Sequence, residues 1–167
     1  MTDREEVGPV RAGDRSDLTS FPLVGWVASL PGVERRLRAG ARVAAVGCGA
    51  GQALIELADA YPRSTFHGFD ADPAMIDRAR VTSAEAGVSD RVTFEVAPTA
   101  RFPGAGYDLI YAVGMPEGHD AALLLADRIR RAVVAGGAWF LCDPGAGHGP
   151  APAPDVRRAG RRSDPPV

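Results

Sequence analysis

The fold of this chain is decided by one stretch, Val43-Ala44-Ala45-Val46-Gly47-Cys48-Gly49-Ala50-Gly51. Its first half continues a short apolar run that predicts a buried strand over 42–46. Its second half is a glycine-rich turn, where the backbone can bend sharply and approach a ligand without a Cβ in the way. Residues 50–60 then carry apolar side chains at helical spacing. A helix that starts at such a turn offers free N–H groups and a partial positive charge, which suit a carboxylate or phosphate.

Outward from this stretch, predicted strands and helices alternate along the chain. Asp72-Pro73 is a helix start, with Asp as the N-cap and Pro in the first helical position. Pro31-Gly32 separates two early helices, and Gly136-Gly137 closes a late one. The further strands are predicted over 64–69, 91–96, 107–113 and 138–142, and the other helices over 21–30, 33–38, 72–87 and 120–134.

This alternation predicts an α/β fold with a doubly wound, mostly parallel, Rossmann-like sheet of about five strands. In such sheets the ligand lies beyond the carboxyl ends of the strands, where the strand order reverses. The glycine turn follows the first strand, so we expect it to line that ligand site.

The two ends of the chain differ in composition from the middle. Residues 1–19 are polar and predict a flexible lead-in, whereas 144–167 are rich in Pro, Gly and Arg and predict a disordered tail. The folded domain is therefore expected over 20–143. The N-terminus lacks the apolar core of a signal peptide, and no apolar run approaches the roughly 20 residues of a membrane span. Cytoplasm is the expected location.

Charge and cysteine content exclude several classes of function. The formal net charge is -2 and the pI is near 5.9, so no net positive field favours nucleic acid or an anionic membrane. The two cysteines, Cys48 and Cys142, have no CxxC neighbour and no nearby His at metal spacing, so no metal site is predicted. The chain contains no Lys, which excludes a P-loop ATPase.

The spacing of the glycines discriminates between cofactors. A dinucleotide loop has the pattern GxGxxG, but here the third glycine is Gly51 and Gln52 stands where that pattern needs glycine. A dinucleotide oxidoreductase is therefore disfavoured, although it stays an alternative. Asp70, nineteen residues after Gly51, closes the second predicted strand and can accept hydrogen bonds from a ribose diol. Asp70 could instead cap the next helix, but we expect Asp72 to be that cap.

From Gly40 to Pro144, about two thirds of the chain, the sequence resembles the class I S-adenosylmethionine (SAM)-dependent methyltransferases. The resemblance rests on four segments rather than on the glycine loop alone. They are VAAVGCGAG at 43–51, GFDADPAMIDRAR at 68–80, AGVSDRVTF at 86–94 and YDLI at 107–110. The resemblance implies SAM as the cofactor and a small-molecule methyl acceptor.

The resemblance also implies roles for individual residues. The loop residues would face the methionine part of SAM; they are Gly47, Cys48, Gly49 and Gly51. Asp70 would hold the ribose hydroxyls, and Ala71 would lie against the adenine. Val113-Gly114, after the fourth strand, would form the floor of the pocket near the methyl group.

The chain departs from the family pattern in several places. Ala45 stands where relatives usually have an acid, and Pro98 stands where they usually have an Asp that binds the adenine amino group. Each lost hydrogen bond costs about 1 kcal/mol, so two losses weaken binding roughly ten- to a hundredfold. No residues after Cys142 predict the family's final β-hairpin. The fifth strand would then be an open edge, which could pair with a second copy of the chain in a homodimer.

The candidate catalytic residues lie in the loop after the fourth strand. If the substrate needs a general base, His119 and Glu117 are the candidates, although a solvated loop residue is the favoured interpretation of each. His67 is expected to be structural and His148 to have no role. Cys48 is close to a helix N-terminus, which could lower its pKa, or it could simply be a small packed residue.

Two functions fit these observations best. The first is a SAM-dependent methyltransferase acting on a small molecule, which the loop and Asp70 favour. The second is a degenerate, non-catalytic SAM-binding homologue with a dimerisation or regulatory role, which Ala45 and Pro98 favour. The sequence does not identify the methyl acceptor, because the segments that would select it match the family loosely or not at all.

Overall fold

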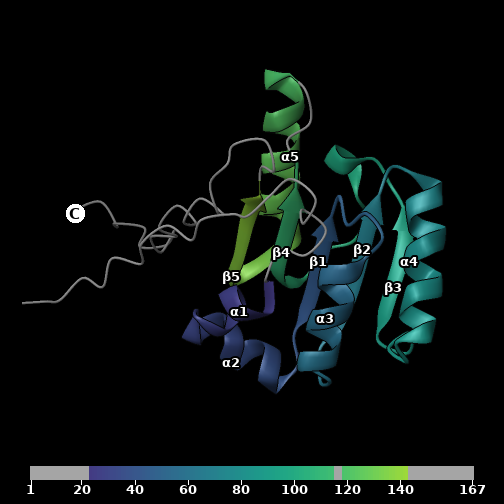
Figure 1. The fold of residues 1–167 in the computed structure, drawn as a ribbon. Helices are drawn as coiled ribbons and strands as arrows, with labels where there is room; N and C mark the ends of the chain where they lie inside the picture. Colours follow the sequence, from purple (N-terminus) through teal and green to yellow (C-terminus); the bar gives the residue numbers. More distant parts are fainter. Residues whose placement is uncertain (1–22, 115–117, 143–167) are drawn as a thin grey trace, which may run out of the picture.

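The structure, a computed structural model, describes residues 23–114 and 118–142. Its centre is a five-stranded sheet in the order β3-β2-β1-β4-β5, with all neighbours parallel (Figure 1). The strands are β1 (Arg42–Val46), β2 (Thr65–Asp70), β3 (Val92–Val96), β4 (Tyr107–Val113) and β5 (Val133–Cys142). The predicted doubly wound, Rossmann-like α/β fold is confirmed.

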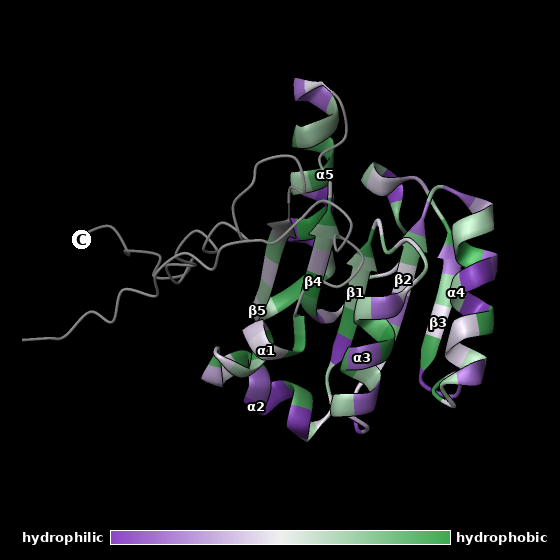
Figure 2. Cartoon of the chain, viewed as in Figure 1, coloured by the Kyte–Doolittle hydropathy of each residue, from purple (hydrophilic) through white to green (hydrophobic). Residues whose placement is uncertain are grey.

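Helices cover both faces of the sheet. They are α1 (Leu23–Ala28), α2 (Pro31–Ala39), α3 (Gln52–Ala60), α4 (Pro73–Glu85), the 3-10 helix η1 (Thr99–Arg101) and α5 (His119–Ala132). Side chains of β1 alternate between two buried clusters: Val43 and Ala45 pack with α1 to α4, and Ala44 and Val46 pack with Phe102 and α5. In Figure 2 the outer helices, such as α4, alternate between hydrophilic and hydrophobic residues, as one-sided burial requires.

Two element boundaries differ from the prediction. Pro31-Gly32 does not separate the first two helices but begins α2, because Pro suits the first turn of a helix. Gly136-Gly137 does not close α5 but lies inside β5. Opposite these glycines the register shifts, because the pair Tyr107↔Val133 is followed by the pair Leu109↔Ala138. Gly136 has φ +73° there, a value that favours glycine.

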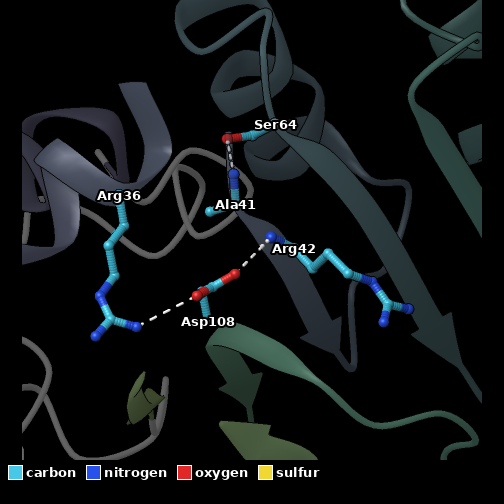
Figure 3. A network of polar contacts seen from close by, with 5 residues as sticks. All are labelled: Arg36, Ala41, Arg42, Ser64 and Asp108. Carbon is cyan, nitrogen blue, oxygen red and sulfur yellow. Dashed lines mark hydrogen bonds and ion pairs between the residues drawn. The ribbon is translucent and has the colours of Figure 1, made fainter. Parts of the chain in front are cut away.

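The amino ends of the strands are held by polar contacts (Figure 3). The Asp108 carboxylate accepts a hydrogen bond from the backbone N–H of Arg42 at 3.0 Å and pairs with the Arg36 guanidinium at 3.2 Å. The Ser64 hydroxyl accepts from the backbone N–H of Ala41 at 3.0 Å and donates to the carbonyl of Leu37 at 2.7 Å. These contacts tie α2, β1 and β4 together at the end of the sheet opposite the predicted site. They give Asp108, a residue of the YDLI segment, a structural role.

Candidate cofactor-binding site

The glycine loop joins β1 to α3 at the carboxyl edge of the sheet. Gly47, Gly49 and Gly51 have φ values of +72°, +55° and +78°, in the left-handed region that side chains rarely adopt. At Gly47 there is also no room, because a Cβ would lie 2.6 Å from the carbonyl oxygen of Val113. The loop therefore passes close to the end of β4. Since the chain reverses its strand order between β1 and β4, this is the switch point where such sheets bind ligands.

Asp70 connects the loop to the end of β2. One oxygen of its carboxylate accepts a hydrogen bond from the backbone N–H of Gly49 at 2.8 Å, and the other accepts from the N–H of Asp72 at 2.9 Å. A carboxylate can accept about four hydrogen bonds, so two acceptor positions are left for a ligand diol. The structure thus brings together the acid and the glycine loop, which lie apart in the sequence.

Asp72 caps α4, as the sequence predicts. Its side chain accepts a hydrogen bond from the backbone N–H of Ala74 at 2.9 Å, and Pro73 occupies the first turn. The two neighbouring acids therefore have different partners. Asp72 caps the start of α4, and the Asp70 carboxylate binds the backbone of the glycine loop. The assignment of Asp70 to a ribose is still a prediction.

The same edge offers space and hydrogen-bond donors for a cofactor. No side chain of the described residues caps α3, so the N–H groups of its first turn can bind an anionic group. Gly49 and Gly114 follow the adjacent strands β1 and β4, and a Cβ built on either would meet no atom within 4 Å. A glycine loop, an uncapped helix N-terminus and a half-buried carboxylate together fit a molecule with both a carboxylate and a ribose, as SAM has.

Three more predicted residues lie at this edge. Ala71 is exposed and follows Asp70 directly. Val113 is the last residue of β4 and half-buried, and Gly114 follows it with φ +76°. Their positions fit the predicted roles next to adenine and at the floor of the pocket, but these roles are still predictions.

Cys48 does not have the lowered pKa that its place near a helix N-terminus could give. Burial, and to a lesser extent the charge of Asp70, raise the pKa of its thiol to about 12. Its Sγ lies 3.0 Å from where a Cβ on Gly68 would stand. The raised pKa keeps the Cys48 thiol neutral, which fits the interpretation of Cys48 as a small packed residue of the loop.

The candidate bases are only partly covered by the structure. His119 is the exposed first residue of α5, and Glu117 lies outside the described residues. Among the described residues no cluster of three or more His, Cys, Asp or Glu side chains could hold a metal ion. None of the described helices is both long enough and apolar enough to cross a membrane.

Phe94 is the residue near the site that the sequence analysis missed. It lies on β3, opposite Gly68 of β2 in the register of the sheet. A signal was present, since a glycine in the middle of a strand often marks a close approach of another group. The backbone of the following segment also supports the site, because the N–H of Ala97 donates to the carbonyl of Asp70 at 2.9 Å.

The two departures from the family pattern lie at opposite levels of burial. Ala45 is 1% exposed and belongs to the buried core. Its methyl side chain has no polar group that could bind a ligand. Pro98 is exposed, has extended backbone angles and precedes η1. It offers the site neither a side-chain acceptor nor a backbone N–H.

The fold, the loop at the switch point and the acid at the end of β2 define a class I SAM-dependent methyltransferase domain. A family model described as "Methyltransferase domain" matches residues 43–137, and the chain belongs to this family. The match runs from β1 into β5 and includes the loop and Asp70.

Among curated proteins, the chain is similar to 27-O-demethylrifamycin SV methyltransferase of Amycolatopsis mediterranei (strain S699). The two are 34% identical over 79 residues, which are 46% of this chain and 29% of the relative. The chain thus spans less than a third of the length of the curated relative that it matches.

Solved structures show the same fold. The SAM-dependent methyltransferase SibL, in its apo form, is 25% identical with a TM-score of 0.61, over 75% of this chain and 36% of SibL. The N,N-8-amino-8-demethyl-D-riboflavin dimethyltransferase RosA of Streptomyces davawensis is 24% identical with a TM-score of 0.57, over 64% of this chain and 32% of RosA. Both similarities concern the fold, and each covers well under half of the other chain.

Proposed function

We propose that this chain binds SAM and takes part in methyl transfer to a small molecule. The observation that carries the proposal is the hydrogen bond of 2.8 Å between the Asp70 carboxylate and the Gly49 N–H. It joins the acid and the loop at the switch point of the sheet, where one ligand can contact both. Family membership supports SAM as that ligand.

The residues present suit the separate parts of SAM. The N–H groups at the start of α3 would bind the methionine carboxylate, with Gly47, Cys48, Gly49 and Gly51 lining that side. The Asp70 carboxylate would accept hydrogen bonds from the ribose hydroxyls. The adenine would lie against Ala71, close to the exposed Val96, which pairs with Asp70 in the sheet.

When bound, SAM supplies a methyl group on a positively charged sulfur. In the transfer, the acceptor atom forms a bond to the methyl carbon, and the carbon–sulfur bond breaks to leave a neutral thioether. The chain's part is to hold the sulfur and the acceptor in line, and Val113 and Gly114 would form that side of the pocket. If the acceptor carries a proton, His119 and Glu117 are the proposed bases.

A small-molecule acceptor is supported by the relatives. The curated relative is a demethylrifamycin methyltransferase and RosA is an aminoriboflavin dimethyltransferase. We extend only the class of acceptor from these proteins to this chain. We also propose a homodimer that pairs through β5, which is the last strand in the described sheet.

The alternative is a SAM-binding homologue without catalytic activity. Ala45 and Pro98 favour it, because both positions lack the hydrogen-bonding groups that relatives usually have there. Such a chain would bind the cofactor weakly and act through its partner. The two hypotheses therefore assume the same fold and differ in whether the chain transfers a methyl group.

Calorimetric titration with SAM and with its demethylated product, S-adenosylhomocysteine (SAH), tests the proposal. We expect binding by the unaltered chain and a loss of at least about tenfold in affinity for Asp70→Ala, since both a ligand contact and the loop contact disappear. Asp72→Ala is the matched control, because that acid caps α4 and is not directed to the loop.

The outcomes separate the hypotheses. No heat at millimolar SAH would refute cofactor binding, and equal affinity of the Asp70→Ala variant would remove Asp70 from the site. Incubation with methyl-labelled SAM and a panel of small hydroxyl and amine compounds then separates the two functions. Transfer of label supports the enzyme, whereas binding without transfer favours the non-catalytic homologue.

A further inference from the structure

The ring of Phe94 lies beneath the glycine loop, on the face of the sheet that α3 and α4 cover. Phe94 is 6% exposed and belongs to the same buried cluster as Ala79 of α4. A Cβ built on Gly51 would lie 2.6 Å from the Cζ of this ring. The ring is thus in direct contact with the residue at which the loop becomes helix α3.

The same ring also fills the space above Gly68 in β2. A Cβ on Gly68 would lie 2.6 Å from Cε1 of Phe94 and 3.0 Å from Sγ of Cys48. Real Cβ atoms essentially never come within 3.0 Å of another atom, so a side chain here would have to displace the ring. One aromatic ring therefore contacts two glycines, and the thiol of the loop packs next to it.

Gly51 and Gly68 are glycines for different physical reasons. Gly51 has φ +78°, so any side chain there is strained even where space is available. Gly68 is not among the described glycines with positive φ, and an L residue can adopt its strand conformation. The three atoms nearest to a side chain at Gly68 belong to the Phe94 ring and to Cys48. Substitution of Gly68 therefore tests the packing of the ring separately from backbone strain.

We infer that Phe94 is a positioning residue for the cofactor loop. Its ring supports Gly51 and Cys48 from below and so sets the height and direction of the loop and of the α3 N-terminus. This inference rests on the proposed function, in which the loop faces the methionine part of SAM. Phe94 is no catalytic residue, because its ring is buried in the core beneath the loop.

The test is a double-variant cycle between Gly68 and Phe94. Gly68→Ala forces the ring against the loop, and we expect affinity for SAH to fall about tenfold or more. Phe94→Val removes the ring atoms that the new methyl group would meet. The double variant Gly68→Ala/Phe94→Val is expected to recover a substantial part of the affinity lost in Gly68→Ala. Gly32→Ala is the matched control, because a Cβ at Gly32 meets no atom within 4 Å.

A second ligand separates positioning from general loss of structure. 5′-Methylthioadenosine has the adenosine of SAM but lacks the amino-acid part that the loop would face. We expect Gly68→Ala to weaken SAH and to leave the affinity for 5′-methylthioadenosine within about twofold of the unaltered chain. If Gly68→Ala does not fold, Phe94→Val alone is expected to show the same difference between the two ligands.

Several results would overturn the inference. Unchanged SAH affinity in Gly68→Ala, an equal loss for both ligands, or a double variant no better than Gly68→Ala would each do so while the proposed function stands. If the unaltered chain binds neither SAH nor 5′-methylthioadenosine, the proposed function fails first and the positioning role fails with it.

Discussion

At the scale of single residues, His67 and Tyr107 form a polar pair on the face of the sheet away from Phe94. The Nδ1 atom of His67 lies 2.9 Å from the hydroxyl of Tyr107, and the Arg42 guanidinium lies over the Tyr107 ring at 5.2 Å. Burial, and after it the charge of Arg42, lower the pKa of His67, while Glu95 acts weakly in the opposite direction. The prediction that His67 is structural fits this arrangement.

The lowered pKa of His67 predicts a pH-dependent stability. In the unfolded chain the His67 pKa returns to its ordinary value of 6.5, so unfolded molecules bind a proton first as the pH falls. The contribution of neutral His67 to the free energy of unfolding is therefore fully present above pH 6.5. It is lost as the pH falls from 6.5 to the lowered pKa of His67 in the folded state. Urea unfolding between about pH 5 and about pH 8 measures this loss.

The variant His67→Gln is expected to remove this part of the pH dependence, because it has no proton to gain. His119→Gln, at an exposed histidine, is the control and is expected to keep the dependence of the unaltered chain. A His67→Gln chain with an unchanged pH profile would contradict the assignment.

The residue scale also shows what the sequence could not provide. Local patterns make several site residues recognisable. Asp70 ends a strand, Asp72 precedes Pro73 as a helix cap, and the loop glycines follow a short apolar run. Gly68 indicates that some group approaches β2 closely, but only the register of the sheet identifies that group as Phe94. In the sequence it is one apolar residue of a strand among others. Ala45 and Pro98 are visible as departures, but only the structure shows that one is in the core and the other exposed.

At the scale of elements, α4 depends on its first turn. The cap from Asp72 to the N–H of Ala74 satisfies one of the four donors that a helix leaves free at its start. Asp72→Ala is expected to lower the free energy of unfolding by about 1 kcal/mol. Asp77→Ala, further along the same helix, removes only an exposed ion pair with Arg80 and is expected to change stability by less than about 0.5 kcal/mol. Equal losses in the two variants, measured by urea unfolding, would contradict the capping role.

The elements with local signals were predicted well, and those set by distant contacts were not. β4 was predicted at 107–113 as observed, and the start of α4 followed from Asp72-Pro73. The sequence pattern predicts that the helix ends at 134 and the strand begins at 138, whereas α5 ends at Ala132 and β5 begins at Val133. The position of this boundary depends on the pairing of Val133 with Tyr107, a contact between separate strands that the order of residues does not reveal. The short helix η1 was missed for lack of any periodic pattern.

At the scale of the whole molecule, the exposed side of β5 is the feature that bears on assembly. β5 is the last strand in the described sheet order, and Ala135 on it is exposed. If the proposed homodimer forms there, sedimentation velocity should show mass rising from 17.4 kDa toward twice that value with concentration. Ala135→Lys is expected to shift the equilibrium to the monomer, because Lys on an edge strand opposes pairing. A single species of monomer mass at all concentrations would refute this dimer.

β1 is the first of the five strands in the chain, yet it lies in the middle of the sheet. Its partner on one side, β2, is synthesised soon after it. On the other side Val43 pairs with Leu109 of β4, and β4 comes after α3, β2, α4, β3 and η1 in the chain. During translation one edge of β1 therefore waits for β4, and such long-range parallel pairing is slow and open to aggregation. We expect the unit from β1 to β3 to form first on the ribosome, with the half of the cofactor edge that includes Asp70 complete before Val113 and Gly114 exist.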